Sequence, residues 1–227
     1  MGRAPRVDIG GEVYHIINRA NNRTQIFKSD DDYKHFERLL KEANERIPVG
    51  ILAYVLMPNH WHLVLHPKRD GDLSLFMHWL TLTHTQQYHA KTKTIGHGHL
   101  YQGRYKAFIV EQDDYLIQLI RYVERNPLRA RLERKAEDWR WGSAWRRYNG
   151  TASEKRLLAE LPTKLPHGYR SWLNDRDDLA QLEAIRTSVN KGTPYGTMNW
   201  VDKMVKKFDL LLTTRTRGRP KKTEKGT

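Results

Sequence analysis

Apolar and polar residues alternate with two periodicities along the first two thirds of the chain, one typical of strands and one typical of helices. Short apolar or alternating segments predict four strands, over residues 12–18, 49–57, 60–65 and 105–110. Apolar residues at helical spacing predict three helices, over residues 30–43, 73–90 and 114–125. The resulting order, β-α-β-β-α-β-α, is that of a ferredoxin-like, split-βαβ α+β sandwich, in which one antiparallel sheet carries helices mainly on one face.

The pattern changes after about residue 150, where polar and charged residues dominate. Two amphipathic helices are predicted there, over residues 178–189 and 198–211. The last fifteen residues carry six basic side chains against a single acid, and we do not expect them to pack. The chain is therefore divided into a principal domain (1–150), a basic helical extension (151–212) and a basic tail (213–227).

Charge and cysteine content narrow the classes of partner and chemistry. Lys and Arg total 40 against 26 Asp and Glu, a formal net charge of +14, which favours a polyanionic partner such as nucleic acid. The lack of cysteine excludes disulfides, thiol nucleophiles and cysteine-bound zinc. We expect a cytoplasmic, nucleoid-associated protein, because no segment has the apolar core of a signal peptide or the ~20 apolar residues of a membrane span.

Two histidines in the third predicted strand are candidate metal ligands. Side chains alternate faces along a strand, so His60 and His62 point the same way and begin about 6.6 Å apart. Two neutral imidazoles on one ion leave room for a further ligand, water and a phosphate oxygen. His66 shares their face but lies two strand steps further on, and we leave it out of the ligand set. The alternative is a pair of strand histidines that bind no metal.

The third predicted helix offers the complementary chemistry. Tyr115, Tyr122 and Asn126 lie on one stripe of it, at steps of seven and four residues. Pro127 disfavours helical geometry at Asn126, which could turn the Asn126 amide toward the histidines. An amide oxygen beside two imidazoles suits a hard ion such as Mg²⁺ or Mn²⁺, and a phenol there could attack a phosphodiester. Only one tyrosine can reach such an ion, and the alternative is that both rings simply pack.

Five segments in sequence resemble the HUH nuclease family, specifically the REP-associated tyrosine transposases and related single-tyrosine insertion-sequence transposases. Together they span roughly residues 7–148. They are Arg19-Ala-Asn-Asn-Arg23 with Ile26-Phe27, Tyr54-Val-Leu-Met-Pro-Asn-His-Trp-His-Leu, Gly103-Arg-Tyr-Lys-Ala-Phe, Tyr122-Val-Glu-Arg-Asn-Pro-Leu-Arg-Ala and Trp139-Arg-Trp-Gly-Ser-Ala.

The resemblance implies the HUH nuclease fold for residues 1–150 and a role for each candidate. His60 and His62 would be the family's histidine pair, and Tyr122 the nucleophile, since it stands four residues before the Asn of the Asn-Pro dipeptide. Asn126 would be the third ligand of Mg²⁺ or Mn²⁺, where many relatives have Gln. Such enzymes form a covalent 5′-phosphotyrosine and release a 3′-hydroxyl. This branch acts on palindromic repeats folded into hairpins with adjacent single-stranded DNA, and we expect a monomer, with a dimer left open.

Several basic and amide side chains are candidates for DNA contact, since such groups track a phosphate backbone. In the principal domain they are Arg19, Asn21, Asn22, Arg23, Arg104 and Lys106, each of which could equally be a solvated surface group. In the tail, Arg217-Gly-Arg219-Pro resembles an AT-hook, which inserts into a narrow minor groove.

Three other interpretations fit part of this pattern. An RRM-like module that binds nucleic acid without cutting it explains the charge and fold, but it leaves the histidine, tyrosine and asparagine arrangement as coincidence. A replication-initiator or relaxase-type HUH nuclease shares the chemistry, although the chain is short and contains no helicase domain. A metallohydrolase that activates water would not need Tyr122.

The tail yields a first testable prediction. Deleting residues 213–227 removes six cations, so DNA affinity should fall and its salt dependence should flatten while cleavage persists. Binding isotherms of the full and shortened chains at two or more salt concentrations measure both effects. Equal affinity of the two chains at low salt would contradict a DNA-binding tail.

Overall fold

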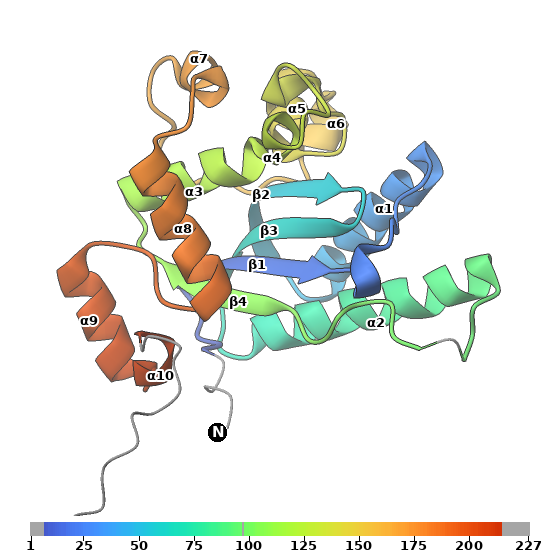
Figure 1. Cartoon of the computed structure of the whole chain (residues 1–227), viewed down its shortest axis with the longest axis horizontal. Coiled ribbons are helices and arrows are strands. Elements are labelled where there is room, and N and C mark those ends of the chain that lie inside the picture. The colour runs from blue at the N-terminus through green and yellow to red at the C-terminus, as the bar shows by residue number, and fades with distance from the viewer. Residues whose placement is uncertain (1–6, 97, 215–227) are drawn as a thin grey trace, which may run out of the picture.

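The computed structural model describes residues 7–96 and 98–214, and its centre is a four-stranded antiparallel sheet flanked by helices (Figure 1). The strands lie in the order β2-β3-β1-β4, which confirms the α+β, ferredoxin-like arrangement predicted from the order of the elements. They are β1 (Val13–Arg19), β2 (Val49–Met57), β3 (His60–Pro67) and β4 (Lys106–Val110).

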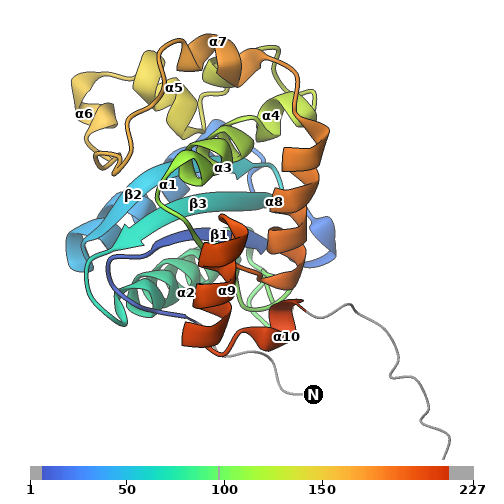
Figure 2. The ribbon, with the colours of Figure 1, turned by 90° about the vertical axis from the view of Figure 1, so that its left-hand side faces the viewer.

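Two long helices, α1 (Asp30–Arg46) and α2 (Asp72–Thr92), pack on one face of the sheet (Figure 2). α1 begins where the sequence predicts, because Asp32 accepts a hydrogen bond from the backbone N–H of Ser29, the residue before the helix (3.0 Å). The large side chains between this helix pair and the sheet are fully buried, among them Phe36, Trp61 and Phe76.

The opposite face is covered as well, so the prediction of helices mainly on one face was wrong. α3 (Asp114–Glu124) and α8 (Leu179–Lys191) lie there (Figure 2). The physical reason is visible in β1, where every residue from Val13 to Asn18 is buried, as in a strand covered on both faces. The apolar stripe of α3 meets this face and is fully buried, at Leu116, Ile120 and Val123.

The chain after residue 150 is helical and packs on the principal domain. α8 contacts α3 and β4, whereas α9 (Met198–Lys207) packs Trp200 and Met204 against the core beneath α1 and α2, as does Phe208, the residue after the helix. α10 ends at Thr214, two residues past the expected end of the extension, and the rest of the tail lies outside the described residues. The remaining helices are η1 (Asn21–Arg23), α4 (Asn126–Arg129), η2 (Ala136–Asp138), α5 (Ser143–Tyr148), α6 (Ala152–Lys155), α7 (Tyr169–Asn174), α9 (Met198–Lys207) and α10 (Leu211–Thr214). Over residues 7–96 and 98–214, no helix combines the length and apolarity needed to cross a membrane.

The segment after η2 covers the outer edge of the sheet. Leu56 of β2 donates its backbone N–H to the carbonyl of Trp141 (2.9 Å), and the Trp139 indole donates to the carbonyl of Leu56 (2.9 Å). The Trp141 ring stacks on Tyr33 of α1, with ring centroids 4.8 Å apart. An open edge strand would be a site for aggregation, so the Trp139-Arg-Trp-Gly-Ser-Ala motif has a structural role here.

A buried carboxylate anchors the far end of α3. The Glu124 side chain accepts hydrogen bonds from the hydroxyls of Ser143 (2.6 Å) and Tyr169 (2.8 Å) and from Arg147 (3.2 Å). Removing such a buried charge from its partners is strongly destabilising in general. Side chains of α5 and α7 therefore hold α3 in place at Glu124, two residues after Tyr122.

Candidate active site

Three imidazoles gather on the face of the sheet that α3 covers. His60 and His62 of β3 share this face, as the sequence predicts, and their ring centroids lie 5.2 Å apart. The third is His15 of β1, whose ring centroid is 5.0 Å from that of His62. The antiparallel register pairs Ile17 with His62, so His15 and His62 are diagonal neighbours on one face. His66 is remote from this cluster and contacts the carbonyl of Gly11 (3.2 Å).

Tyr122 of α3 lies against these imidazoles. Its ring centroid is 6.0 Å from that of His62 and 6.3 Å from that of His15, although sixty residues of chain separate it from His62. Tyr115, the other tyrosine of this helix, packs edge-on against Tyr195, with ring centroids 5.0 Å apart. Between the two competing phenols, the fold therefore brings Tyr122 to the histidine pair.

Hydrogen bonds at Nδ1 orient both rings of the pair. His60 Nδ1 bonds the side-chain oxygen of Asn59 (2.7 Å), and the amide nitrogen of Asn59 donates to the carbonyl of Arg23 (3.1 Å). His62 Nδ1 lies 2.8 Å from Nε2 of His15. Partners on the far nitrogen commonly fix the orientation of metal-binding imidazoles. In both rings Nε2 is therefore the nitrogen that remains to bind a ligand.

Burial determines the charge of these rings. Desolvation, with the nearby cation Arg19, lowers the pKa of His60 to about 4. Burial lowers the pKa of His15 to about 3, and burial together with the neighbouring imidazoles and Arg129 holds the pKa of His62 well below its usual range. The three imidazoles are therefore neutral at pH 7, which is the form that binds metal ions.

Asn126 lies one turn beyond Tyr122, but the helix break falls one residue earlier than predicted. Arg125 stands between α3 and α4, at φ −86° and ψ −1°, and Asn126 begins α4 with Pro127 in its first turn. This placement satisfies proline, whose missing N–H is harmless at a helix start. The amide nitrogen of Asn126 donates hydrogen bonds to the carbonyls of Tyr122 (3.2 Å) and Val123 (3.0 Å). Oδ1 is therefore the side-chain atom that remains to coordinate a cation.

The donor set fits a divalent ion only if the amide takes part. Within the described part of the chain, no three His, Cys, Asp or Glu side chains are placed to hold a metal ion together. Two neutral imidazoles and one amide oxygen are nevertheless donor types that would suit Mn²⁺ or Mg²⁺, with water and phosphate completing the shell. The three imidazoles alone do not form a three-ligand site.

Arg129 is a residue of this site that sequence reasoning missed. Its guanidinium carbon lies 4.4 Å from the centre of the Tyr122 ring, and its Nη2 donates to the Tyr122 carbonyl. Asp177, in the segment before α8, lies 3.6 Å from the Arg129 guanidinium. Burial raises the pKa of the Tyr122 hydroxyl, and the charge of Arg129 opposes that increase. A basic residue seven positions after Tyr122, two helical turns on, was the available signal in the sequence.

The candidate DNA-binding residues of the principal domain gather at the end of the sheet that holds His60. Backbone hydrogen bonds tie this region together, from Ala20 to Asn59 (2.9 Å), from Asn21 to Leu100 (2.8 Å) and from Gln102 to Arg19 (3.0 Å). Arg19 is half-buried at the end of β1, opposite His60 in the register. The exposed candidates are Asn21, Asn22, Arg23, Arg104 and Lys106. Arg217 and Arg219 lie outside the described residues.

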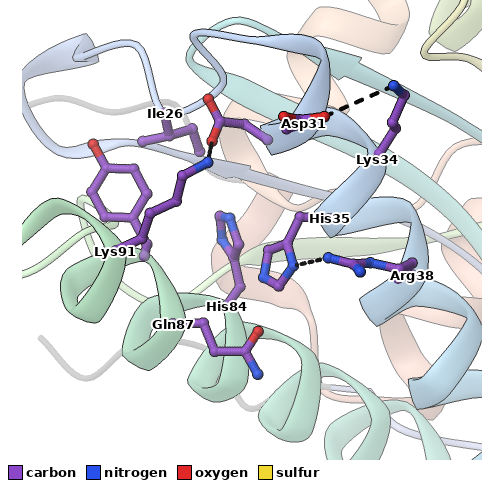
Figure 3. A pocket seen from close by; sticks show the side chains of 10 residues that line it. Ile26, Asp31, Lys34, His35, Arg38, His84, Gln87 and Lys91 are labelled. Atoms are coloured by element: carbon purple, nitrogen blue, oxygen red, sulfur yellow. Dashed lines mark hydrogen bonds and ion pairs between the residues drawn. The ribbon is translucent and has the colours of Figure 1, made fainter.

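The opposite face of β3 carries a second polar network. The Trp61 indole donates to the Tyr101 hydroxyl (3.0 Å), and that hydroxyl is hydrogen-bonded to Nδ1 of the buried His84 (2.6 Å). His84 in turn borders a pocket of about 540 Å³ between α1 and α2 (Figure 3). In this pocket Lys91 pairs with Asp32 (2.6 Å) and Lys34 with Asp31 (3.8 Å), on the side of the sheet that α1 and α2 cover. The pocket is therefore separated from the imidazole cluster by the sheet.

Comparisons with known proteins agree on one family. The family model described as "Transposase IS200 like" matches residues 11–126, about half of the chain. A protein of Haemophilus influenzae, provisionally described as a REP-associated tyrosine transposase, is 21% identical over 141 residues, covering 59% of this chain and 80% of that protein. A solved structure of a REP-associated tyrosine transposase bound to a REP hairpin matches with a TM-score of 0.54 and 19% identity, covering 64% of this chain and 84% of that one. At that identity the structural match shows a shared fold.

His84 yields a prediction for the pH dependence of stability. Burial lowers the pKa of His84 to about 3, against about 6.5 in the unfolded chain, so its contribution is complete above pH 6.5 and is lost as the pH falls toward 3. In His84→Asn the amide oxygen can still accept from Tyr101, but nothing titrates. Between pH 7 and pH 5 the wild-type free energy of unfolding should fall by about 2 kcal/mol more than that of the variant. Urea denaturation at both pH values measures this, and parallel losses would refute the assignment.

Proposed function

The chain belongs to the IS200-like transposase family, and we propose that it is a metal-dependent nuclease and strand transferase that cuts and rejoins single-stranded DNA through Tyr122. The observation that carries the proposal is the meeting of the Tyr122 ring with His62 at 6.0 Å, on the face where His60 also lies. A binding module without catalysis has no need to bury a phenol against neutral imidazoles. The resemblance of the surrounding motifs to HUH transposases supports the same roles.

The proposed ligands are His60, His62 and Asn126. Nε2 of each imidazole and Oδ1 of Asn126 would hold Mg²⁺ or Mn²⁺, which supplies Lewis-acid stabilisation of charge on the scissile phosphate. Asn59 and His15 keep the two rings oriented through their Nδ1 atoms. Burial keeps both imidazoles neutral at pH 7, the charge state in which an imidazole can bind a metal ion.

Tyr122 is the proposed nucleophile. Its hydroxyl oxygen forms a bond to phosphorus as the bond from phosphorus to the 3′ oxygen breaks, which leaves a 5′-phosphotyrosine and a 3′-hydroxyl. The phenol loses its proton in this step and the 3′ oxygen gains one, with water as the exchange medium. Attack by a new 3′-hydroxyl reverses the step and joins strands. Arg129, stacked on the Tyr122 ring, would offset the negative charge that develops there.

Hairpin DNA of palindromic repeats is the proposed substrate. The solved structure that shares this fold is described as bound to a REP hairpin. In this chain the exposed basic and amide residues lie at the sheet end next to His60, where a strand entering the site would pass; they are Asn21, Asn22, Arg23, Arg104 and Lys106. Tyr122 meets His62 within one chain, so the proposed site needs no residue from a second copy, and we propose a monomeric enzyme.

Substitution of the nucleophile tests the proposal. Tyr122→Phe should abolish both cleavage and the covalent adduct on a single-stranded hairpin substrate with Mn²⁺, because only the attacking oxygen is lost. Tyr115→Phe is the matched control on the same helix and should keep both. A denaturing gel reports the adduct, and mass spectrometry maps the modified residue. Cleavage by Tyr122→Phe without an adduct would instead indicate a hydrolase that uses water.

Arg129 allows a finer test of the charge beside the nucleophile. Arg129→Gln should slow adduct formation by about 100-fold, as expected when a donor that stabilises developing charge is lost. Arg129→Lys keeps the charge but loses the planar group over the ring, so its rate of adduct formation should lie between those of the wild type and Arg129→Gln. Single-turnover rates at saturating DNA separate this effect from DNA affinity. Wild-type rates in Arg129→Gln would exclude a catalytic role for this side chain.

A further inference from the structure

We propose that His15 is a positioning residue, which controls whether His62 can bind the metal ion by setting the protonated nitrogen of the His62 ring. The inference rests on the proposed role of His60 and His62 as metal ligands. It concerns a residue that lies in none of the motif segments by which the chain resembles HUH transposases. Its basis is one short contact, between Nε2 of His15 and Nδ1 of His62 at 2.8 Å.

His15 is sealed inside the protein. Its side chain is fully buried, with the Phe108 ring 4.8 Å away and the Tyr122 ring 6.3 Å away, measured between ring centroids. Its Nδ1 atom is buried without a hydrogen-bond partner among the described residues. Buried polar atoms normally have partners, so an orphan beside a functional site calls for an explanation.

A direct role as a third ligand is not the explanation. His15, His60 and His62 do not converge as a group able to hold one ion within the described residues. The Nε2 atom of His15 is aimed at a ring nitrogen of His62 rather than at a common point with the other two rings. His15 therefore acts on the metal ion only through His62.

The contact can be made in two ways, because each ring nitrogen carries either a proton or a lone pair. If His62 donates from Nδ1, its Nε2 lone pair is free for a metal ion, but the orphan Nδ1 of His15 must then carry a proton. If His15 donates from Nε2, its Nδ1 holds only a lone pair, and His62 carries its proton on Nε2. The second state blocks the ligand position, and the first leaves a buried N–H unpaired.

The metal-free protein should favour the second state, because an orphaned N–H is more costly than an orphaned lone pair. Binding of the ion requires the first, so both rings must change tautomer together. His60 differs in this respect. Its partner is the Asn59 oxygen, which can only accept, and the Arg23 carbonyl fixes that orientation by accepting from the amide nitrogen. The tautomer of His60 is thus fixed before the ion binds, whereas the tautomer of His62 is fixed only on binding.

Two substitutions of His15 separate this role from packing. Glutamine can offer an amide oxygen to Nδ1 of His62, whereas leucine of similar size can offer nothing. His15→Leu should weaken Mn²⁺ binding by about 10- to 100-fold, the usual cost of losing such a partner. His15→Gln should stay within about threefold of wild type. Isothermal titration of the full chain without DNA measures the affinities, and thermal unfolding compares the stability of each variant.

Nitrogen NMR of the histidine rings reads the tautomers directly. In the wild-type chain without metal, His62 should carry its proton on Nε2, and saturating Mg²⁺ should move it to Nδ1 with a matching change at His15. Equal Mn²⁺ affinity of His15→Leu and wild type would overturn the proposal. If that variant does not fold, unchanged His15 ring protonation on addition of Mg²⁺ would overturn it. His62→Ala identifies a different failure, since undiminished Mn²⁺ affinity there would refute the metal site itself.

Discussion

The candidate active site depends on the burial of three imidazoles between the sheet and α3. Such a position penalises the charged form, so the rings stay neutral and keep their lone pairs at pH 7. It also removes water, so each ring nitrogen needs a partner from the protein. The register of β1 against β3 gives Nδ1 of His62 its partner by placing His15 diagonally opposite, and it leaves Nδ1 of His15 without one among the described residues. Packing thus sets the positions and the neutral charge of the rings before any ligand arrives.

The C-terminal extension also contributes to the candidate active site, because it fixes the position of α3, the helix that carries Tyr122. Glu124 is held by Tyr169 of the extension and by Ser143 of the principal domain, while Arg121 of α3 and Arg125, the next residue after that helix, donate to backbone carbonyls of the segment 172–176. Asp177 contacts Arg121, Arg125 and Arg129, at 2.8 to 3.6 Å. The phenol is thereby placed by residues that come fifty positions later in the chain, and the extension cannot be treated as an independent appendage.

Periodicity was enough to predict the local elements, whereas contacts between distant segments were not. Alternation put His60 and His62 on one face, and helical spacing put Tyr122 and Asn126 on one stripe, as the structure shows. His15 could not be found this way, because its meeting with His62 depends on the register of two strands 47 residues apart. The covered second face could have been inferred from the unbroken apolar run at residues 51–57 of β2. Arg129 required knowing that α4 continues almost directly from α3.

Trp61 explains why the histidine pair faces α3 and not α1 and α2. A slip of one residue in β3 would exchange the two faces, placing Trp61 against α3 and the imidazoles in the apolar layer behind the sheet. The fully buried indole fills that layer and bonds Tyr101, which bonds His84, so the slip would break a satisfied polar chain and leave a void. The residue between the two histidines has no contact with the proposed substrate in this scheme. Its packing on the far face nonetheless specifies which side of the strand can do chemistry.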